Sequence, residues 1–329
     1  MKDIKITDLS FSKLTLLSKA LAIVVERSIE INIDLRNLPF CKPQDILHLA
    51  LILQKFKVEK LAKCKITISP RSNVTSYLAH IGFFDLIDFP YGNEVGMARA
   101  NSSYVPIRRI NKIELLNTCF ETGEKLQDLI QLEAESLARV LLGSSKRTST
   151  FLIISYSIRE AIRNALEHSE QDICYVCGQK WATGVSQITV IDNGIGIYES
   201  FRKADIADVS TTNFLDLAVK PGFSRTISLS ETDNIHDNSG YGLYVIYEIA
   251  RNYGNFLISS SNSFLSVDQS LGRQKGTSQH VGTLLSLTFN SYPNDAKDLL
   301  NMIILSGEEE ALSEGRKQSS SRSKSLAVN

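Results

Sequence analysis

Three short stretches decide how this chain folds: REAIRNALEH at residues 159–168, VIDNGIGI at 190–197 and DNSGYGLYVIYEIAR at 237–251. Their hydrophobic spacing predicts a helix for the first and a buried strand running into a turn for the second. The third passes from a glycine loop into another helix. Each pattern alone is weak. All three together, in this order and on these elements, indicate one composite binding site.

The first stretch places polar side chains on one face of the predicted helix, where Glu160, Asn164 and His168 are spaced four residues apart. The opposite face is apolar and consists of Ile158, Ile162, Ala165 and Leu166. Alone, such a polar face is more typical of a solvated surface helix. As a site, it offers the Asn164 amide oxygen to Mg²⁺, which prefers oxygen ligands. Glu160 could then take a proton from the group that attacks a γ-phosphate.

The second stretch ends a predicted strand in Asp192, followed by Gly194 and Gly196. A carboxylate at this point can accept a hydrogen bond from the exocyclic amine of adenine, whereas guanine presents a carbonyl there. The two glycines would let the backbone approach the base and adopt positive φ. A simple Asp-Asn-Gly hairpin turn is the alternative. It explains Asn193 and Gly194 but leaves Gly196 unexplained.

In the third stretch, Gly240 and Gly242 precede a predicted helix that ends at Gly254. A glycine loop that leads into a helix N-terminus offers free amides to phosphate, although a plain flexible linker has the same pattern. Thr283 begins the predicted strand TLLSLTF, and its hydroxyl could bond Asp192 or a water molecule. Most threonines at strand starts are simply strand formers.

Taken together, residues 121–290 resemble the GHKL (Bergerat-fold) ATPases. The resemblance implies an α/β two-layer sandwich that holds ATP and Mg²⁺ between a mixed sheet and helices, under a mobile lid at 198–239. It assigns the catalytic base to Glu160 and the metal ligand to Asn164. The remaining nucleotide-binding positions that it implies are His168, Asp192, Gly194, Gly196, Gly240, Gly242 and Thr283. Lys220 and Arg225 lie in the lid segment, where a surface role is favoured over phosphate contact.

The N-terminal region alternates strand-like runs with amphipathic helices, which predicts an α/β domain over residues 1–95. INIDLRNLPF followed by a helix resembles the STAS-like fold of anti-sigma antagonists. Those antagonists carry a phosphorylatable serine at the start of this helix, but the present chain reads CKPQD at 41–45. A docking role is therefore expected rather than a phosphorylation switch.

The predicted fold class is α/β, with the STAS-like domain followed by a GHKL sandwich at 121–293. Turn-forming residues at 96–120 predict a connector. A long amphipathic helix is expected at 121–142, where it could pair with a second copy of the chain. Residues 294–329 are predicted to form a short helix and a disordered polar tail.

Composition narrows the partners and the location. Lys plus Arg and Asp plus Glu both number 36, so the net charge gives no drive toward nucleic acid or anionic membranes. We expect a cytoplasmic protein because neither a signal peptide nor an apolar run of ~20 residues is visible. Cys174 and Cys177 fall in a strand-like run, where they would face opposite sides instead of sharing a metal.

Two functions stay open from the sequence. The first is a Mg-ATP-binding regulator, either an ATPase or an anti-sigma-like protein serine kinase, that changes its binding to an unidentified protein partner through lid ordering. The second is a non-catalytic interaction module in a multiprotein signalling or defence system. Sensor histidine kinases are disfavoured because the 121–142 helix has no histidine. Gyrase-like and chaperone members are disfavoured because little chain follows Pro293.

Overall fold

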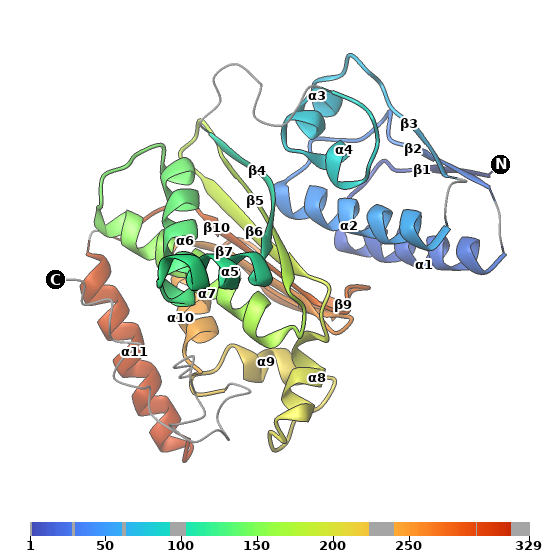
Figure 1. Cartoon of the computed structure of the whole chain (residues 1–329). Coiled ribbons are helices and arrows are strands. Elements are labelled where there is room, and N and C mark those ends of the chain that lie inside the picture. The colour runs from blue at the N-terminus through green and yellow to red at the C-terminus, as the bar shows by residue number, and fades with distance from the viewer. Residues whose placement is uncertain are drawn as a thin grey trace.

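The structure, a computed structural model, describes residues 2–27, 30–60, 64–92, 103–223, 240–293 and 295–316. The fold is mixed α/β, as the sequence predicts, with a three-stranded parallel sheet and a seven-stranded antiparallel sheet (Figure 1). Among the described helices, none combines the length and the apolar character that crossing a membrane requires.

The N-terminal unit alternates strands and helices. Its elements are β1 (Lys2–Lys5), α1 (Phe11–Arg27), β2 (Ile31–Asp34), α2 (Pro43–Lys60), β3 (Cys64–Thr67), α3 (Asn73–His80) and α4 (Phe83–Leu86). The strands pair in parallel in the order β1-β2-β3, so each crossover contains a helix. Ile31 and Ile33 of the central strand are fully buried, and Pro43 is the first residue of α2, a position that proline tolerates.

The larger unit contains the other elements. They are β4 (Tyr104–Asn111), α5 (Lys112–Thr122), α6 (Leu126–Leu142), α7 (Ser149–His168), β5 (Ile173–Lys180), β6 (Ser186–Asp192), α8 (Gly196–Lys203), α9 (Phe214–Ala218), α10 (Gly242–Tyr253), β7 (Gly254–Ser260), β8 (Ser263–Asp268), β9 (Gly272–Thr277), β10 (Thr283–Phe289) and α11 (Ala296–Ser313). The strand order is β4-β5-β6-β10-β7-β8-β9. Because β6 and β10 are antiparallel neighbours, the end of β6 lies beside the start of β10.

Alternate residues of the central strands face two different cores. Val190 of β6 and Leu285 of β10 pack with α6, α7 and α10, whereas Ile191 and Leu284 pack with the N-terminal unit. The large sheet is therefore covered on both faces, by α7 and its neighbours on one side and by α2 on the other (Figure 1). Strands β6 and β10 therefore lie between the two units.

The predicted connector at 96–120 is wrong where the structure describes it. Residues 104–111 form β4, an edge strand, and residues 112–122 form α5. Pro106 obscures the strand pattern, but an edge strand tolerates proline, and the register shifts between Val105 and Arg108. Gly123, with φ of 77°, ends α5, so the helix predicted at 121–142 begins only at Leu126.

Two further expectations need correction. The lid segment expected at 198–239 contains regular structure, because α8 and α9 occupy part of it, and residues 224–239 lie outside the described residues. The C-terminal helix α11, which was expected to be short, extends from Ala296 to Ser313. Gly307 permits this because its Cα packs against the Tyr244 ring, where a side chain would collide. The rest of the predicted tail, 317–329, is not described.

Candidate functional site

Helix α7 carries the polar face that the sequence predicts. The Thr148 hydroxyl accepts a hydrogen bond from the Phe151 amide and so caps the helix start. Glu160 is buried, Asn164 is half-buried, and His168 is the last residue of the helix. The opposite face is buried as expected and contains Ile158, Ile162, Ala165 and Leu166. Successive members of the polar face are about 6 Å apart along the axis.

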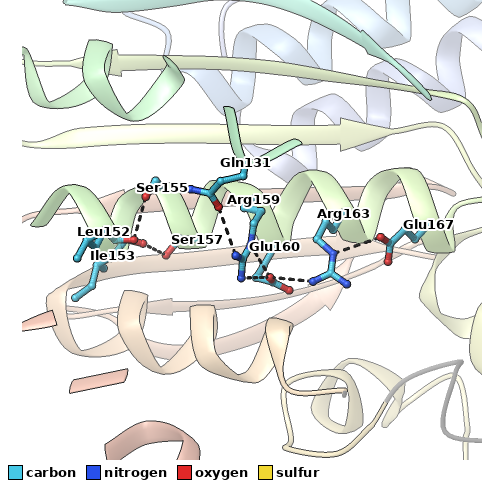
Figure 2. A network of polar contacts seen from close by, with 9 residues as sticks. All are labelled: Gln131, Leu152, Ile153, Ser155, Ser157, Arg159, Glu160, Arg163 and Glu167. Carbon is cyan, nitrogen blue, oxygen red and sulfur yellow. Dashed lines mark hydrogen bonds and ion pairs between the residues drawn. The ribbon is translucent and has the colours of Figure 1, made fainter. Parts of the chain in front are cut away.

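Glu160 lies in a network of buried ion pairs (Figure 2). Its Oε1 accepts hydrogen bonds from Arg159 Nε at 3.1 Å and Nη2 at 2.9 Å, and from Arg163 Nη1 at 3.2 Å. Burial raises the pKa of Glu160, but Arg163 and Arg159 more than offset it, so the pKa lies below its ordinary value. Arg163 Nε also donates to Glu167, and Arg159 Nη1 to Gln131. Glu160 is therefore ionised, and one of its oxygens is already occupied.

The second glycine pair meets α7 at Glu160. A Cβ added to Gly242 would lie 2.4 Å from Glu160 Oε2, so only glycine fits there with Glu160 in place. Gly240 has φ of 75°, a conformation that favours glycine, and its carbonyl accepts a hydrogen bond from the Gly222 amide at 3.1 Å. The N-terminus of α10 thus abuts the middle of α7.

In the first glycine pair, Gly194 packs against the C-terminal end of α7. A Cβ on Gly194 would lie 2.1 Å from the Ser169 carbonyl oxygen, and the Ile195 amide donates to that same oxygen at 3.0 Å. Gly196 has φ of 75°, and a Cβ there would lie 2.3 Å from the Val281 carbonyl oxygen. From the sequence, we expected these glycines to allow close approach of a ligand. In the structure, close packing of the chain on itself already requires glycine at both positions.

Asp192 is the last residue of β6 and is almost fully buried. Its Oδ1 accepts hydrogen bonds from the amides of Gly194 at 2.8 Å and Thr283 at 3.2 Å. Its Oδ2 makes no hydrogen bond with any residue that the structure describes. Burial raises the pKa of Asp192 to about 7, against the lowering effect of the two backbone bonds. The carboxyl group is thus oriented by one oxygen and leaves the other available.

Thr283 lies next to Asp192, but through a different group from the one that the sequence suggested. Its backbone amide, not its hydroxyl, donates to the carboxylate. The Thr283 hydroxyl lies 3.1 Å from the Ser260 hydroxyl. Ser260 and Ser261 in turn accept hydrogen bonds from the first amides of α8, at 2.9 and 3.2 Å. Sequence reasoning missed these two serines because the helix that they contact lies 63 residues earlier in the chain, and the local pattern gives no signal of that contact.

Asn164 lies between the two glycine contacts, about 6 Å along the helix from Glu160 and about 7.5 Å from Ser169. Its Nδ2 is buried without a hydrogen-bond partner among the described residues. Such an orphaned group destabilises the fold unless another molecule satisfies it. Because Gly194 contacts both Ser169 and Asp192, Asn164 and Asp192 lie within roughly 20 Å of each other.

The remaining expectations concern charge and metals. Lys220 pairs with Glu314 at 3.1 Å on the surface, and Arg225 lies outside the described residues. Cys174 and Cys177 are buried in opposite cores, which confirms that they do not share a site. The described residues contain no cluster of three His, Cys, Asp or Glu side chains that could hold a metal ion. A magnesium ion here would need an amide oxygen, phosphate oxygens and water.

A comparison with known protein families finds no match, and a search of curated proteins finds none either.

Proposed function

We propose that this chain is a Mg-ATP-binding regulatory protein, built from a GHKL-type nucleotide domain and a STAS-like N-terminal domain. The observation that carries the proposal is the placement of Asp192 and Asn164. Asp192 is buried and Asn164 is half-buried, each has a side-chain atom without a hydrogen bond among the described residues, and the contacts through Gly194 and Ser169 keep them within roughly 20 Å of each other. Asp192 Oδ2 is suited to the adenine amine, and Asn164 to magnesium or phosphate.

The fit to ATP and Mg²⁺ is supported by the glycine contacts as well. Gly242, the first residue of α10, packs against Glu160, and the amides and dipole of a helix N-terminus stabilise a phosphate placed near them. Magnesium bound to the phosphates would supply charge neutralisation there, and Asn164 is the residue that would hold it.

The ion pairs of Glu160 favour binding over fast turnover. A general base must accept a proton, but Arg159 and Arg163 stabilise the ionised form and occupy one carboxylate oxygen. We therefore place ATPase or protein serine kinase activity second to nucleotide-dependent switching of a protein interaction. The shared core between the sheet and the N-terminal unit supports a switch that involves both domains.

Isothermal titration calorimetry with Mg-ATP tests the proposal. Wild type should bind, and Asp192→Asn should lose at least tenfold in affinity, because an amide presents a donor to the adenine amine and one buried hydrogen bond is lost. Asp85→Asn, the same change at an exposed position of α4, is the matched control and should bind like wild type. Absence of binding by wild type would overturn the proposal.

A further inference from the structure

Helix α2 of the N-terminal unit packs on β5 and β6, on the face of the large sheet opposite α7. Near the start of this helix, Gln187 Nε2 of β6 donates to Gln44 Oε1 at 3.1 Å, and Cys177 Sγ donates to the Pro43 carbonyl at 3.3 Å. One turn further along, His48 of α2 is buried against the same face of the sheet. Helix α2 is thus fixed to β5 and to β6, the strand that ends at Asp192.

His280 connects α2 to Asp192. It lies in the loop between β9 and β10, whose backbone is held by the amides of Ser261 and Asn262, which donate to Val281 and His280 carbonyls at 3.0 and 2.9 Å. The His280 Nε2 is 2.8 Å from the backbone carbonyl oxygen of Asp192. Because a carbonyl can only accept, the ring carries its proton on Nε2 and donates.

The His280 ring also contacts the ring of His48. Their centroids are 5.7 Å apart with planes at 78°, an edge-to-face arrangement, and both side chains are buried. Burial lowers the pKa of His280 to about 4 and that of His48 to about 3, so both rings are neutral at physiological pH. The contact is therefore one of shape and ring packing, without charge repulsion.

These contacts form a continuous path from α2 to the candidate adenine-recognising carboxylate. We propose that His280 is a positioning residue, through which α2 of the N-terminal unit fixes the end of β6 and so sets the affinity and the adenine preference of the Asp192 site. The inference rests on the proposed nucleotide function.

The test compares two pairs of variants in the full chain by calorimetry with Mg-ATP and with Mg-ITP. ITP replaces the exocyclic amine of the base with a carbonyl, so their affinity ratio reports how well Asp192 is placed. His280→Leu removes the donor, whereas His280→Gln keeps an amide N–H that can reach the Asp192 carbonyl. His48→Ala removes the ring contact, whereas His48→Phe retains an aromatic ring. The melting temperature of each variant is measured in parallel.

We expect His280→Leu to lose about tenfold in ATP affinity, with the ATP-to-ITP ratio moving toward one, since a buried donor is lost. His280→Gln should restore most of the affinity and the ratio. His48→Ala should lose less ATP affinity than His280→Leu and shift the ATP-to-ITP ratio less, in the same direction. His48→Phe should keep the affinity and the ratio of the wild type. Should His280→Leu fail to fold, the His48 pair decides the question by the same ratio.

Unchanged affinity and unchanged ratio in folded His280→Leu and His48→Ala would overturn the positioning role while leaving nucleotide binding intact. A fall in melting temperature with no change in the ratio would also overturn it, because His280 would then be purely structural. Failure of wild type to bind either nucleotide is a different result, which removes the proposed function itself.

Discussion

At the scale of single residues, the most informative feature is the buried carboxyl group of Asp192, whose ionised form is destabilised by burial. Asp192 is 1% exposed, and the hydrogen bonds that its carboxylate accepts from described residues all reach Oδ1. Burial without a charged partner destabilises the ionised form. A residue kept in this state is a candidate for ligand recognition, because a ligand that donates to Oδ2 would relieve part of the cost.

The raised pKa of Asp192 predicts how ATP affinity depends on pH. Because Oδ1 accepts from two amides, the proton of the neutral form lies on Oδ2, so the ionised form is the better acceptor for the adenine amine. The pKa of Asp192 in the free protein is about 7. Affinity for Mg-ATP should therefore increase between pH 6 and pH 8 and then level off. Calorimetry in matched buffers measures this, with Asp85→Asn as a control that keeps the same profile. An affinity that is flat from pH 6 to pH 8 would contradict recognition by Asp192.

The same residue predicts an effect on stability. The pKa rises on folding from 3.8 to about 7, so the folded state keeps a proton that the unfolded chain releases in this window. The stabilisation from this group is complete below pH 4 and is lost as the pH approaches 7. Asp192→Asn, which stays neutral, should thus raise the melting temperature more at pH 8 than at pH 5. Equal shifts at both pH values would show that Asp192 is ionised in the fold throughout.

Neutralising Glu160 should lower the stability of the fold, in contrast to neutralising Asp192. Glu160 compensates the guanidinium groups of Arg159 and Arg163, whose side chains are 21% and 13% exposed. Glu160→Gln should destabilise the fold by about 2–3 kcal/mol, because one partner of a buried ion pair is removed. Chemical denaturation measures this, and Glu199→Gln, on the surface pair with Arg202, should cost less than about 1 kcal/mol. Equal losses in the two variants would show that the Glu160 network is not stabilising.

At the scale of elements, helix α7 organises the site because both glycine segments pack on it. Gly194 contacts Ser169 at its C-terminal end, and Gly242 contacts Glu160 in its middle. These contacts explain why the three sequence stretches occur together. They bring one helix, one strand end and one helix start together in space.

Gly242→Ala tests this packing. In an ordinary helix the change would stabilise by up to about 1 kcal/mol. Here the new Cβ would lie 2.4 Å from Glu160 Oε2, which the arginines hold in place, so we expect a net loss of about 1–3 kcal/mol. Differential scanning calorimetry measures the change. A gain in stability would mean that Glu160 moves freely and that α10 is not fitted against it.

Strong local periodicity made several elements predictable. The strand that ends in Asp192, the strand TLLSLTF and the helix that stops before Gly254 all occur as the sequence indicates. Strand β4 was missed because its stability comes from pairing with β5, not from its own pattern. The extension of α11 depends on Gly307 packing against Tyr244, a contact that sequence spacing does not reveal.

The site was predictable in its residue types but not in its contacts. The sequence indicated Asp192, Asn164 and the glycines, yet the partners of Glu160 and the roles of Ser260 and His280 depend on segments far apart in the chain. A histidine in a loop gives no local signal of the carbonyl that it contacts.

At the scale of the whole molecule, the N-terminal unit packs its core against one face of the large sheet. Ile191 and Leu284 of the large sheet belong to the core of the N-terminal unit, and their neighbours in each strand belong to the other core. Two units joined in this way should not behave as independent domains, because a change in one core reaches the other through a single layer of strands.

Leu284→Ala should therefore lower the stability of the whole protein. Leu284 is fully buried, so its truncation should cost about 2–5 kcal/mol, and unfolding should remain one transition. Calorimetry together with circular dichroism measures both properties. Leu271→Ala, at an exposed site, is the control and should have little effect. Two separated transitions, with only one shifted, would show that the N-terminal unit folds independently of the sheet.

The central claim is that Asp192 reads adenine while Asn164 holds magnesium or phosphate. A crystal structure of the full chain with magnesium and a non-hydrolysable ATP analogue tests it most directly. The account predicts the exocyclic amine of the base about 3 Å from an Asp192 carboxylate oxygen, and the triphosphate between Asn164 and the start of α10. A nucleotide bound elsewhere, or one whose base lies away from Asp192, would contradict the account.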